Sequence, residues 1–386
     1  MSDIVLSASV RQNLLSLQST ADLLSTTQNR LATGNKVNSA LDNPTNYFTA
    51  QGLNSRASDI NNLLDGIGNG VQVLQAANTG ITSLQKLVDT AKSIANQALQ
   101  TNSGYTTKSS VAYTGAGAGT GAATADDLTG GGGAGGSKLT GSAFVFTTEA
   151  GAKTITIDGT TVKSLADLNK ALSSNGVSLT ASLTGANELT FTSTNDSAGQ
   201  TITTATTAAA AGTITGDAIE ISIAAASATA GSVTAAVPDA VSQSNRASLV
   251  SQYNQILDQI KTTAQDSSFN GVNLLNGDQL KLVFNETGKS TLTIQGVTFD
   301  PAGLGLNTLT AGTDFVDNFM TNKVLTSLNN ASSTLRSQAS TLGSNLSIVQ
   351  IRQDFSKNLI NVLQTGASNL TLADTNEEAA NSQALS

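Results

Sequence analysis

The chain has 386 residues and contains no Cys, no His and no Trp. Without Cys it cannot form disulfides, thiolate zinc sites or cysteine nucleophiles, and without His it lacks the commonest general base and metal ligand. A net charge of −8, with no cluster of Lys or Arg, predicts that nucleic acid is not a partner. Neither a cleaved signal peptide nor an apolar segment of bilayer length is present in the sequence, so we expect no membrane insertion.

The first hundred residues carry apolar side chains at coiled-coil spacing. Pro44 interrupts this pattern, because it removes a backbone donor and restricts the residue before it. The pattern then resumes and predicts a helix from about Ser55 to Leu99, on the order of 65 Å long, which needs long partners beside it. The first column is Val10, Leu17, Leu24 and Leu31, with Leu14 and Ala21 between; the second is Ile60, Ile67, Leu74, Ile81, Val88 and Ala95, flanked by Leu64, Val71, Leu84, Ala91 and Ala98.

The C-terminal part supplies such partners. A third heptad column, in the C-terminal part, predicts a long helix. A shorter helix is predicted from roughly Arg246 to Ala264. Together with the N-terminal helix they predict an extended antiparallel bundle. The long helix has Leu328, Leu335, Leu342 and Val349, with Leu325, Ala339 and Leu346 between, continued by Ile351, Phe355, Leu359 and Val362; the shorter one has Leu249, Tyr253, Ile256 and Ile260.

The middle of the chain, about residues 104–241, is dominated by Gly, Ala, Ser and Thr. It predicts a flexible linker, strands, a short helix and two hairpins, and therefore a small inserted α+β or mostly β domain. A further hairpin is predicted after the short helix of the bundle. The linker is 129–136; the strands are 144–146 and 154–157, the latter running into a hairpin turn at Asp158-Gly159; the helix is 165–172; the second hairpin is 178–192; the further hairpin is 280–294.

The predicted fold class is therefore mainly α, a long antiparallel coiled-coil bundle formed by both chain ends, with a β-hairpin region and an inserted α+β or mostly β outer domain. No catalytic site is predicted. The Gly130-x-Gly132-x-x-Gly135 match to a dinucleotide fingerprint follows no strand and opens no helix. The acidic pairs Asp126-Asp127 and Glu377-Glu378 are interpreted as solvated charge, because neighbouring side chains diverge. We expect no enzyme activity, no cofactor and no metal.

Several strings resemble those of bacterial flagellins, in the form common in alphaproteobacteria. They are LATGNKVNSA at 31–40, SFNGVNLL at 268–275, LRSQASTLGSNL at 335–346 and NLTLAD at 369–374. The resemblance covers about residues 1–105 and 243–386. It implies a structural subunit of the flagellar filament that self-assembles into a helical homopolymer.

The resemblance also implies the partners and the place of the protein. These are the type III flagellar export machinery, which secretes the chain without a cleaved signal, and the cap and hook-associated proteins; O-linked glycans on the insert are a further option. The alternative function is a hook–filament junction protein or a flagellin-like surface binding protein. The implied domains are an inner-core segment 1–44, a long-helix part of the spoke domain 45–104, a surface-exposed variable insert 105–243, the rest of the spoke domain 244–357, and the start of a C-terminal inner-core segment 358–386.

The resemblance assigns roles to residues as well. The family continues beyond the Glu377-Glu378 pair into an amphipathic helix that this chain lacks, so we expect a shortened inner-core segment. Lys86 and Val88 stand where the string bound by an innate immune receptor has arginines, so we expect weak receptor activation. Assembly residues are Leu6, Val10, Leu14 and Leu17 for the inner tube and Leu64, Ile67, Val71, Leu74, Leu328, Leu335, Leu342 and Leu346 for the coiled-coil core; the diverged receptor patch is Gln85, Lys86, Leu87, Val88 and Asp89.

Overall fold

The protein is described by a computed structural model, which covers residues 8–102, 104–115, 119–130, 136–185, 187–205, 217–223 and 228–386. The chain forms two compact units. Unit 1 consists of Met1–Thr79, Ser267–Val297 and Ser340–Ser386, and unit 2 consists of Gly80–Asp266 and Thr298–Ala339. Across these described ranges, no helix combines the length and apolarity that crossing a membrane requires.

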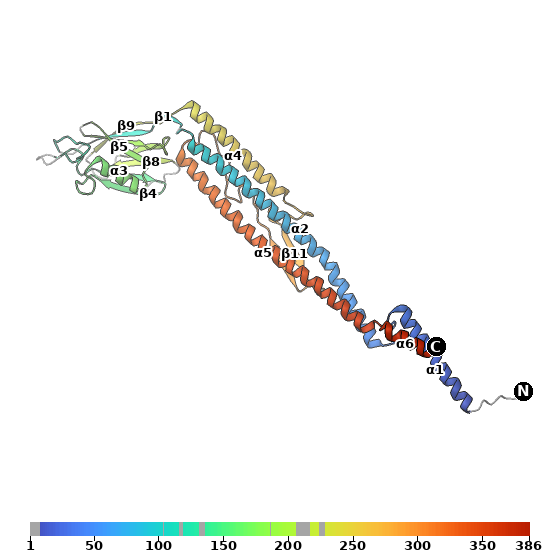
Figure 1. The fold of residues 1–386 in the computed structure, drawn as a ribbon. Helices are drawn as coiled ribbons and strands as arrows, with labels where there is room; N and C mark the ends of the chain where they lie inside the picture. Colours follow the sequence, from blue (N-terminus) through green and yellow to red (C-terminus); the bar gives the residue numbers. More distant parts are fainter. Residues whose placement is uncertain are drawn as a thin grey trace. The chain divides into compact units, whose positions relative to one another are not determined.

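The first and last described helices lie together in unit 1. Helix α1 (Ala8–Thr33) contacts helix α6 (Thr375–Leu385), and Figure 1 shows the two side by side. Beyond them the segments that leave α1 and α5 (Asn318–Thr371) pair, with Lys36 N donating to Thr371 O at 2.8 Å and Ala373 N donating to Gly34 O at 2.9 Å. Gly34 has φ +69°, a left-handed conformation that suits glycine and ends α1.

Helix α2 (Pro44–Gln100) begins eleven residues before the predicted start at Ser55. The reason is local: the Asn43 side chain accepts a hydrogen bond from Asn46 N at 3.0 Å and so caps the helix. Pro44 then occupies the first helical position, where its missing N–H is not needed. The break at Pro44 is confirmed, but the proline opens the next helix instead of standing in a longer loop.

The core of unit 1 joins α2 to the C-terminal part of α5. Its apolar cluster has Ala57 and Ile60 facing Ile360 and Leu363. A Cβ atom placed on Gly366 would lie 3.5 Å from Leu53, whereas one on Gly68 would lie 3.9 Å from Gln353. Because residue numbers rise on one helix as they fall on the other, the two segments are antiparallel, as predicted.

The predicted hairpin 280–294 is confirmed in unit 1. Strands β11 (Gln279–Val283) and β12 (Thr291–Gln295) pair antiparallel, with Leu280 opposite Ile294. The hairpin packs closely on α2, since a Cβ atom on Gly70 would clash with the Leu282 side chain. Glycine at position 70 is therefore required by close packing and not by backbone conformation.

In unit 2 the second part of α2, helix α4 (Ala240–Asp266) and the first part of α5 bury the predicted heptad columns. Helix α4 is longer than the predicted segment from Arg246 to Ala264. Its buried stripe is also rotated, because Leu249 and Ile256 are only half-buried. The buried side chains of the three helical segments include Ile81, Leu84, Val88, Ala91, Ala95, Val250, Tyr253, Leu257, Ile260, Leu328 and Leu335.

The inserted region of unit 2 is built on two four-stranded sheets, of order β5-β6-β2-β9 and β4-β3-β8-β7. All their pairings are antiparallel except that of β7 with β8. Phe144 and Phe191 pack edge to face on Tyr113, and Phe146 packs edge to face on Phe191. The Tyr113 hydroxyl donates to Ile221 O at 3.0 Å. The elements are β1 (Tyr105–Thr107), β2 (Ser110–Gly115), β3 (Ala143–Thr148), β4 (Gly151–Thr156), α3 (Leu165–Ser174), β5 (Leu179–Gly185), β6 (Glu188–Ser193), β7 (Thr201–Ala205), β8 (Ala218–Ile223), β9 (Ala228–Thr234) and β10 (Val237–Pro238), which pairs with β1.

The hairpin turn predicted at Asp158-Gly159 is wrong. Strands β3 and β4 turn earlier, with Thr148 opposite Gly151. The Asp158 carboxylate instead accepts the backbone N–H groups of Thr160, Thr161 and Val162 at 2.7–3.1 Å, and these bonds lower its pKa. A single aspartate thus organises the loop that leads into α3, an alternative use of Asp-Gly that sequence alone does not distinguish.

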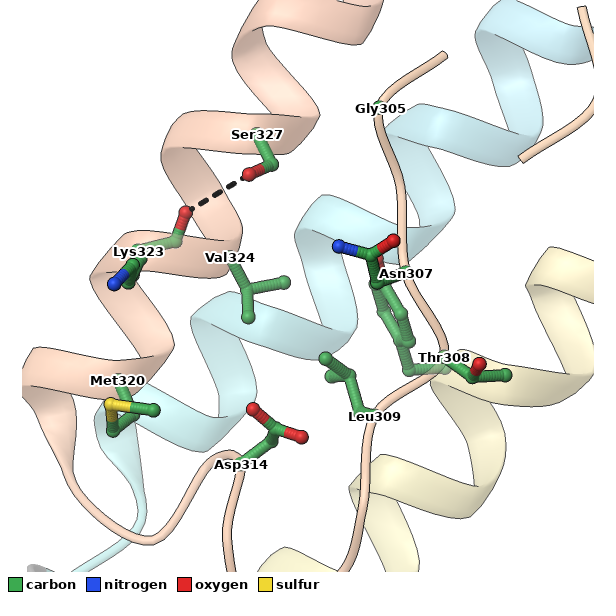
Figure 2. A pocket seen from close by; sticks show the side chains of 10 residues that line it. Gly305, Asn307, Thr308, Leu309, Asp314, Met320, Lys323, Val324 and Ser327 are labelled. Atoms are coloured by element: carbon green, nitrogen blue, oxygen red, sulfur yellow. Dashed lines mark hydrogen bonds between the residues drawn. The ribbon is translucent and has the colours of Figure 1, made fainter. Parts of the chain in front are cut away.

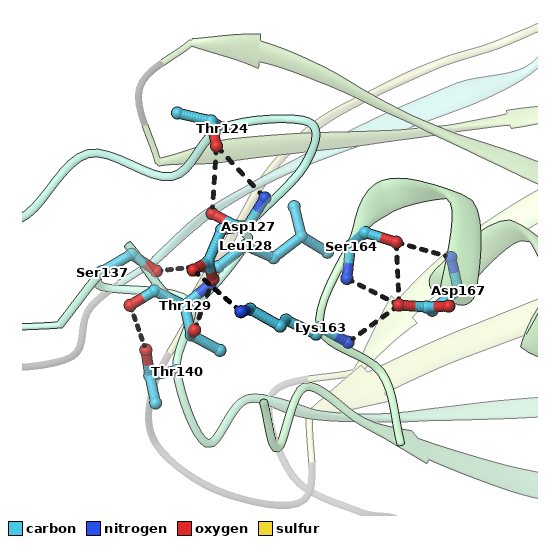
Figure 3. A network of polar contacts seen from close by, with 9 residues as sticks. All are labelled: Thr124, Asp127, Leu128, Thr129, Ser137, Thr140, Lys163, Ser164 and Asp167. Atoms are coloured by element: carbon cyan, nitrogen blue, oxygen red, sulfur yellow. Dashed lines mark hydrogen bonds and ion pairs between the residues drawn. The ribbon is translucent and has the colours of Figure 1, made fainter. Parts of the chain in front are cut away.

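Asp127 is a structural residue and not merely solvated charge. Its Oδ1 accepts from Thr129 N at 2.9 Å and from Thr129 Oγ at 2.5 Å, while Lys163 Nζ lies 3.6 Å from its Oδ2 (Figure 3). Ser164 next to Lys163 forms a capping box with Asp167 and starts α3. The predicted glycine linker at 129–136 and its fingerprint match lie mostly outside the described residues.

The predicted fold class is confirmed: long helices from both chain ends pack together, and a strand-rich region is inserted between them.

Candidate assembly surface

Helix α1 presents an apolar stripe that the described residues of unit 1 leave exposed. Val10, Leu14 and Leu17 follow one another on one face, and Leu17 is 68% exposed. The only buried side chain of the helix is Thr27, near its end. Leu6, predicted on the same stripe, lies outside the described residues. A helix of 26 residues with this much apolar surface in water gains stability when another surface buries its apolar face.

The C-terminal part of α5 has two apolar stripes. One is buried and includes Val349 and Leu363. The other contains Ile351, Phe355 and Val362, which the sequence analysis described as continuing the apolar stripe of the heptad column. These three side chains are 59–66% exposed, so they do not continue the buried stripe. At about 100° per residue, the exposed stripe is rotated by about 120° from the buried one, and it is free to contact a different partner.

The exposed apolar side chains of the described residues are concentrated in unit 1. All of the large ones lie there except Val233, Val237 and Val241. Single exposed apolar residues are ordinary, but a concentration in one unit marks an interaction surface. We call this surface the terminal apolar surface. Its members are Val10, Leu14, Leu15, Leu17, Leu23, Leu31, Leu41, Phe48, Ile348, Ile351, Phe355 and Val362.

An ion pair holds the two chain ends together beside this surface. Arg30 on α1 donates from Nη1 to Glu378 Oε1 on α6 at 3.2 Å. Glu378 is buried, so its interpretation as solvated charge is wrong, whereas Glu377 is exposed. Asp374 starts α6 by accepting from the backbone N–H groups of Asn376 and Glu377. The ends of the chain are therefore docked by specific polar contacts, while their apolar stripes remain outside.

The residues predicted to form the coiled-coil core occupy buried or half-buried positions within the chain. Leu64 and Leu346 are half-buried and belong to unit 1. The fully or nearly fully buried members are Ile67, Val71, Leu74 and Leu342 in unit 1 and Leu328 and Leu335 in unit 2.

The residues named for the diverged receptor patch do not share one surface. Lys86 and Asp89 are exposed, Gln85 and Leu87 are half-buried, and Val88 is fully buried in unit 2. Asp89 forms an ion pair with Lys92 at 3.8 Å. Position 88 therefore contributes to the helical core of this chain and offers no side chain to a receptor.

Arg246, on α4, is a structural residue that the sequence analysis missed. Its side chain is 1% exposed. The guanidinium donates to Asn102 O at 3.0 Å, Thr101 O at 2.9 Å, Phe315 O at 2.8 Å and Asn318 Oδ1 at 3.2 Å. It thereby connects the end of α2 to the start of α5. The sequence feature that could have predicted this structural role is the position of an arginine within an apolar heptad stripe.

A cavity of about 300 Å³ lies between α4, the loop 305–314 and α5 (Figure 2). The polar side chains around it include Asn307, Asp314 and Lys323. Asp314 Oδ2 accepts from Thr310 N at 2.7 Å, and Lys323 pairs with Glu149 at 3.2 Å. Its charged groups are thus engaged in contacts that hold the loop and the insert.

Comparison with known proteins identifies the helical N-terminal part. Residues 5–114 match the family model of the bacterial flagellin N-terminal helical region. Flagellin FljJ of Caulobacter vibrioides is 30% identical over 158 residues, which is 40% of this chain and 56% of that protein. Flagellins FljM and FljK of the same organism are each 30% identical over 139 residues, 36% of this chain and 50% of each relative. The chain thus spans about half the length of these curated relatives. The predicted resemblance to bacterial flagellins is confirmed.

Proposed function

We propose that this chain is a structural subunit of the bacterial flagellar filament and acts by assembling with copies of itself. The observation that carries the proposal is the terminal apolar surface, in which α1 and α5 expose apolar stripes that no described part of unit 1 covers. The match of residues 5–114 to the flagellin N-terminal helical region says which kind of assembly to expect. The role is structural and not catalytic.

The same proposal divides the chain by role. Segments 1–44 and 358–386 would form the inner core of the filament, and 45–104 with 244–357 the spoke domain around it. The insert 105–243 would face the surrounding medium, where its Ser and Thr residues are available to O-linked glycans. The filament is extracellular, and the flagellar export machinery, the cap and the hook-associated proteins are the further partners.

The energetics favour assembly through the stripes. Burying one exposed leucine side chain contributes about 1.5–3 kcal/mol, and each 1.4 kcal/mol changes an association constant about tenfold. Because every subunit of a helical polymer uses the same surface, a substitution affects each contact along the filament.

A seeded assembly test addresses the proposal. The full chain is added to short sheared filaments in assembly-promoting salt, then pelleted and imaged by negative stain. We compare the wild type with Leu14→Asp, which places a charge on the exposed stripe, and with Gln12→Asp, which places the same charge on the opposite face of α1. Leu14 is exposed in the chain, so both variants are expected to keep the helicity and melting temperature of the monomer.

We expect the wild type and Gln12→Asp to extend the seeds and Leu14→Asp to need at least about tenfold more protein. Equal growth of all three would refute the surface, and no growth of any would refute filament assembly by this chain. The alternative, a hook–filament junction protein, predicts immunogold labelling at the filament base only, whereas a filament subunit is labelled along its length.

A further inference from the structure

Two buried carboxylates meet in unit 2 at the junction of the insert with α5. Asp317 immediately precedes α5, and Asp217 immediately precedes β8. The side chains of Asp317 and Gln200 lie close enough to Asp217 to shift its pKa. Asp317 is fully buried and Gln200 is 5% exposed. Three polar side chains from distant parts of the sequence therefore converge at one buried point.

The unpaired atoms at this point are all oxygens. Both carboxylate oxygens of Asp217, Oδ2 of Asp317 and Oε1 of Gln200 are buried without a hydrogen-bond partner. Oδ1 of Asp317 is used differently, because it caps α5 by accepting from Met320 N at 3.0 Å. Buried polar atoms in native proteins are rarely left unpaired, and four acceptors without a donor indicate a missing positive group.

The surrounding side chains do not supply that group. Arg246 is near Asp317, but its guanidinium donates to three backbone carbonyls and to Asn318, and neither aspartate has an ion pair among the described residues. A single proton shared between Asp217 and Asp317 would pair one oxygen of each aspartate. It would leave the second oxygen of Asp217 and Oε1 of Gln200 without a partner.

A cavity adjoins the site on the side of Gln200 and Asp217, whereas Asp317 does not line it. This cavity of about 310 Å³ is lined by Gln200 and Asp217 together with Phe319 and Glu149. This is enough space for a hydrated ion and for waters that complete its coordination.

We propose that Asp217, Asp317 and Gln200 bind a calcium ion that ties the insert to the N-terminus of α5. Calcium takes six to eight oxygen ligands from carboxylates, amide oxygens and water in flexible geometry, which matches this donor set. Magnesium requires a stricter octahedral arrangement. Since only two carboxylates contribute, the site belongs to the weak class of extracellular modules, with a dissociation constant of about 10⁻⁴–10⁻³ M.

The test is calcium titration of the full chain, freed of metal with EDTA, by calorimetry and thermal melting. We compare the wild type with Asp217→Asn and with Glu220→Gln, a control that removes the same charge nearby on β8. We expect one calcium ion per chain and a melting temperature that rises with calcium in the wild type and Glu220→Gln. Asp217→Asn is expected to keep its circular dichroism spectrum and lose at least tenfold in calcium affinity.

Terbium provides an independent readout, because tyrosine can sensitise its emission and the chain has no Trp. Tyr105 is close enough to Asp317 and Asp217 to sense their charges. Tyr105→Phe should therefore reduce the sensitised emission while the calorimetric calcium affinity stays unchanged.

Three results would overturn the proposal. These are the absence of heat and melting shift up to about 10 mM calcium, which is above the expected range, equal calcium affinity of Asp217→Asn and the wild type, and magnesium binding as tight as calcium binding. The first would leave a proton-sharing acid pair as the explanation. Because the assay uses the monomer, its outcome is independent of whether the chain forms filaments.

Discussion

Replacing Arg246 by methionine should destabilise unit 2 strongly. Methionine keeps much of the aliphatic volume of the arginine, so the main loss is the four hydrogen bonds that the guanidinium donates. A hydrogen bond from a charged donor contributes about 1.5–3 kcal/mol net, and a buried carbonyl left unpaired costs about 1–3 kcal/mol. Phe315 O would be such a carbonyl, whereas the carbonyls of Thr101 and Asn102 are near the surface and regain water.

The expected loss is therefore about 3–5 kcal/mol, comparable to breaking a buried ion pair. For a unit of this size it corresponds to a drop of roughly 10 °C in melting temperature. Urea denaturation and thermal melting followed by circular dichroism measure both quantities. Arg336→Met is the matched control, because Arg336 is exposed on α5 and its loss should stay within about 0.5 kcal/mol. Equal effects of the two substitutions would show that the Arg246 contacts do not hold the helices together.

Further predictions concern the core of unit 1, the pH dependence of stability and the loop before α3. Leu342→Asp puts a charge into the core of unit 1 and should cost at least about 3 kcal/mol, whereas Ser344→Asp on the exposed face should not; similar melting curves would contradict this. Burial and the neighbouring Asp317 raise the pKa of Asp217 to about 8. The folded state then holds a proton that the unfolded state releases near pH 4, so the calcium-free protein should lose stability as pH rises from 5 to 8. With no His or Cys in the chain, few other groups titrate in this window, and a flat melting temperature would exclude the effect. Asp158→Ala should loosen the loop before α3 in hydrogen exchange, while Asp158→Asn, which keeps the acceptor, should preserve it. Because backbone hydrogen bonds lower the pKa of Asp158, this loop should lose stability on acidification below about pH 4, and no acid dependence would contradict that.

Local and periodic features of the fold follow from the sequence alone. The heptad column from Ile60 to Ala95 is buried along its whole length, because a repeat of seven keeps one face of a helix toward its partner. The hairpins at 178–192 and 280–294 and the short helix at 165–172 also form as predicted, since their turns and caps involve residues close in sequence. These elements need no knowledge of distant parts of the chain.

Only the tertiary structure decided which apolar stripe is core and which is surface. Near Phe355 helix α5 has two apolar faces, and periodicity cannot say that Leu363 packs inward while Phe355 is exposed, because that depends on where α2 lies. The same holds for the polar groups. Asp217 and Asp317 are a hundred residues apart in sequence, and an acidic residue acquires an unusual role only when folding removes water from it and brings a like charge beside it.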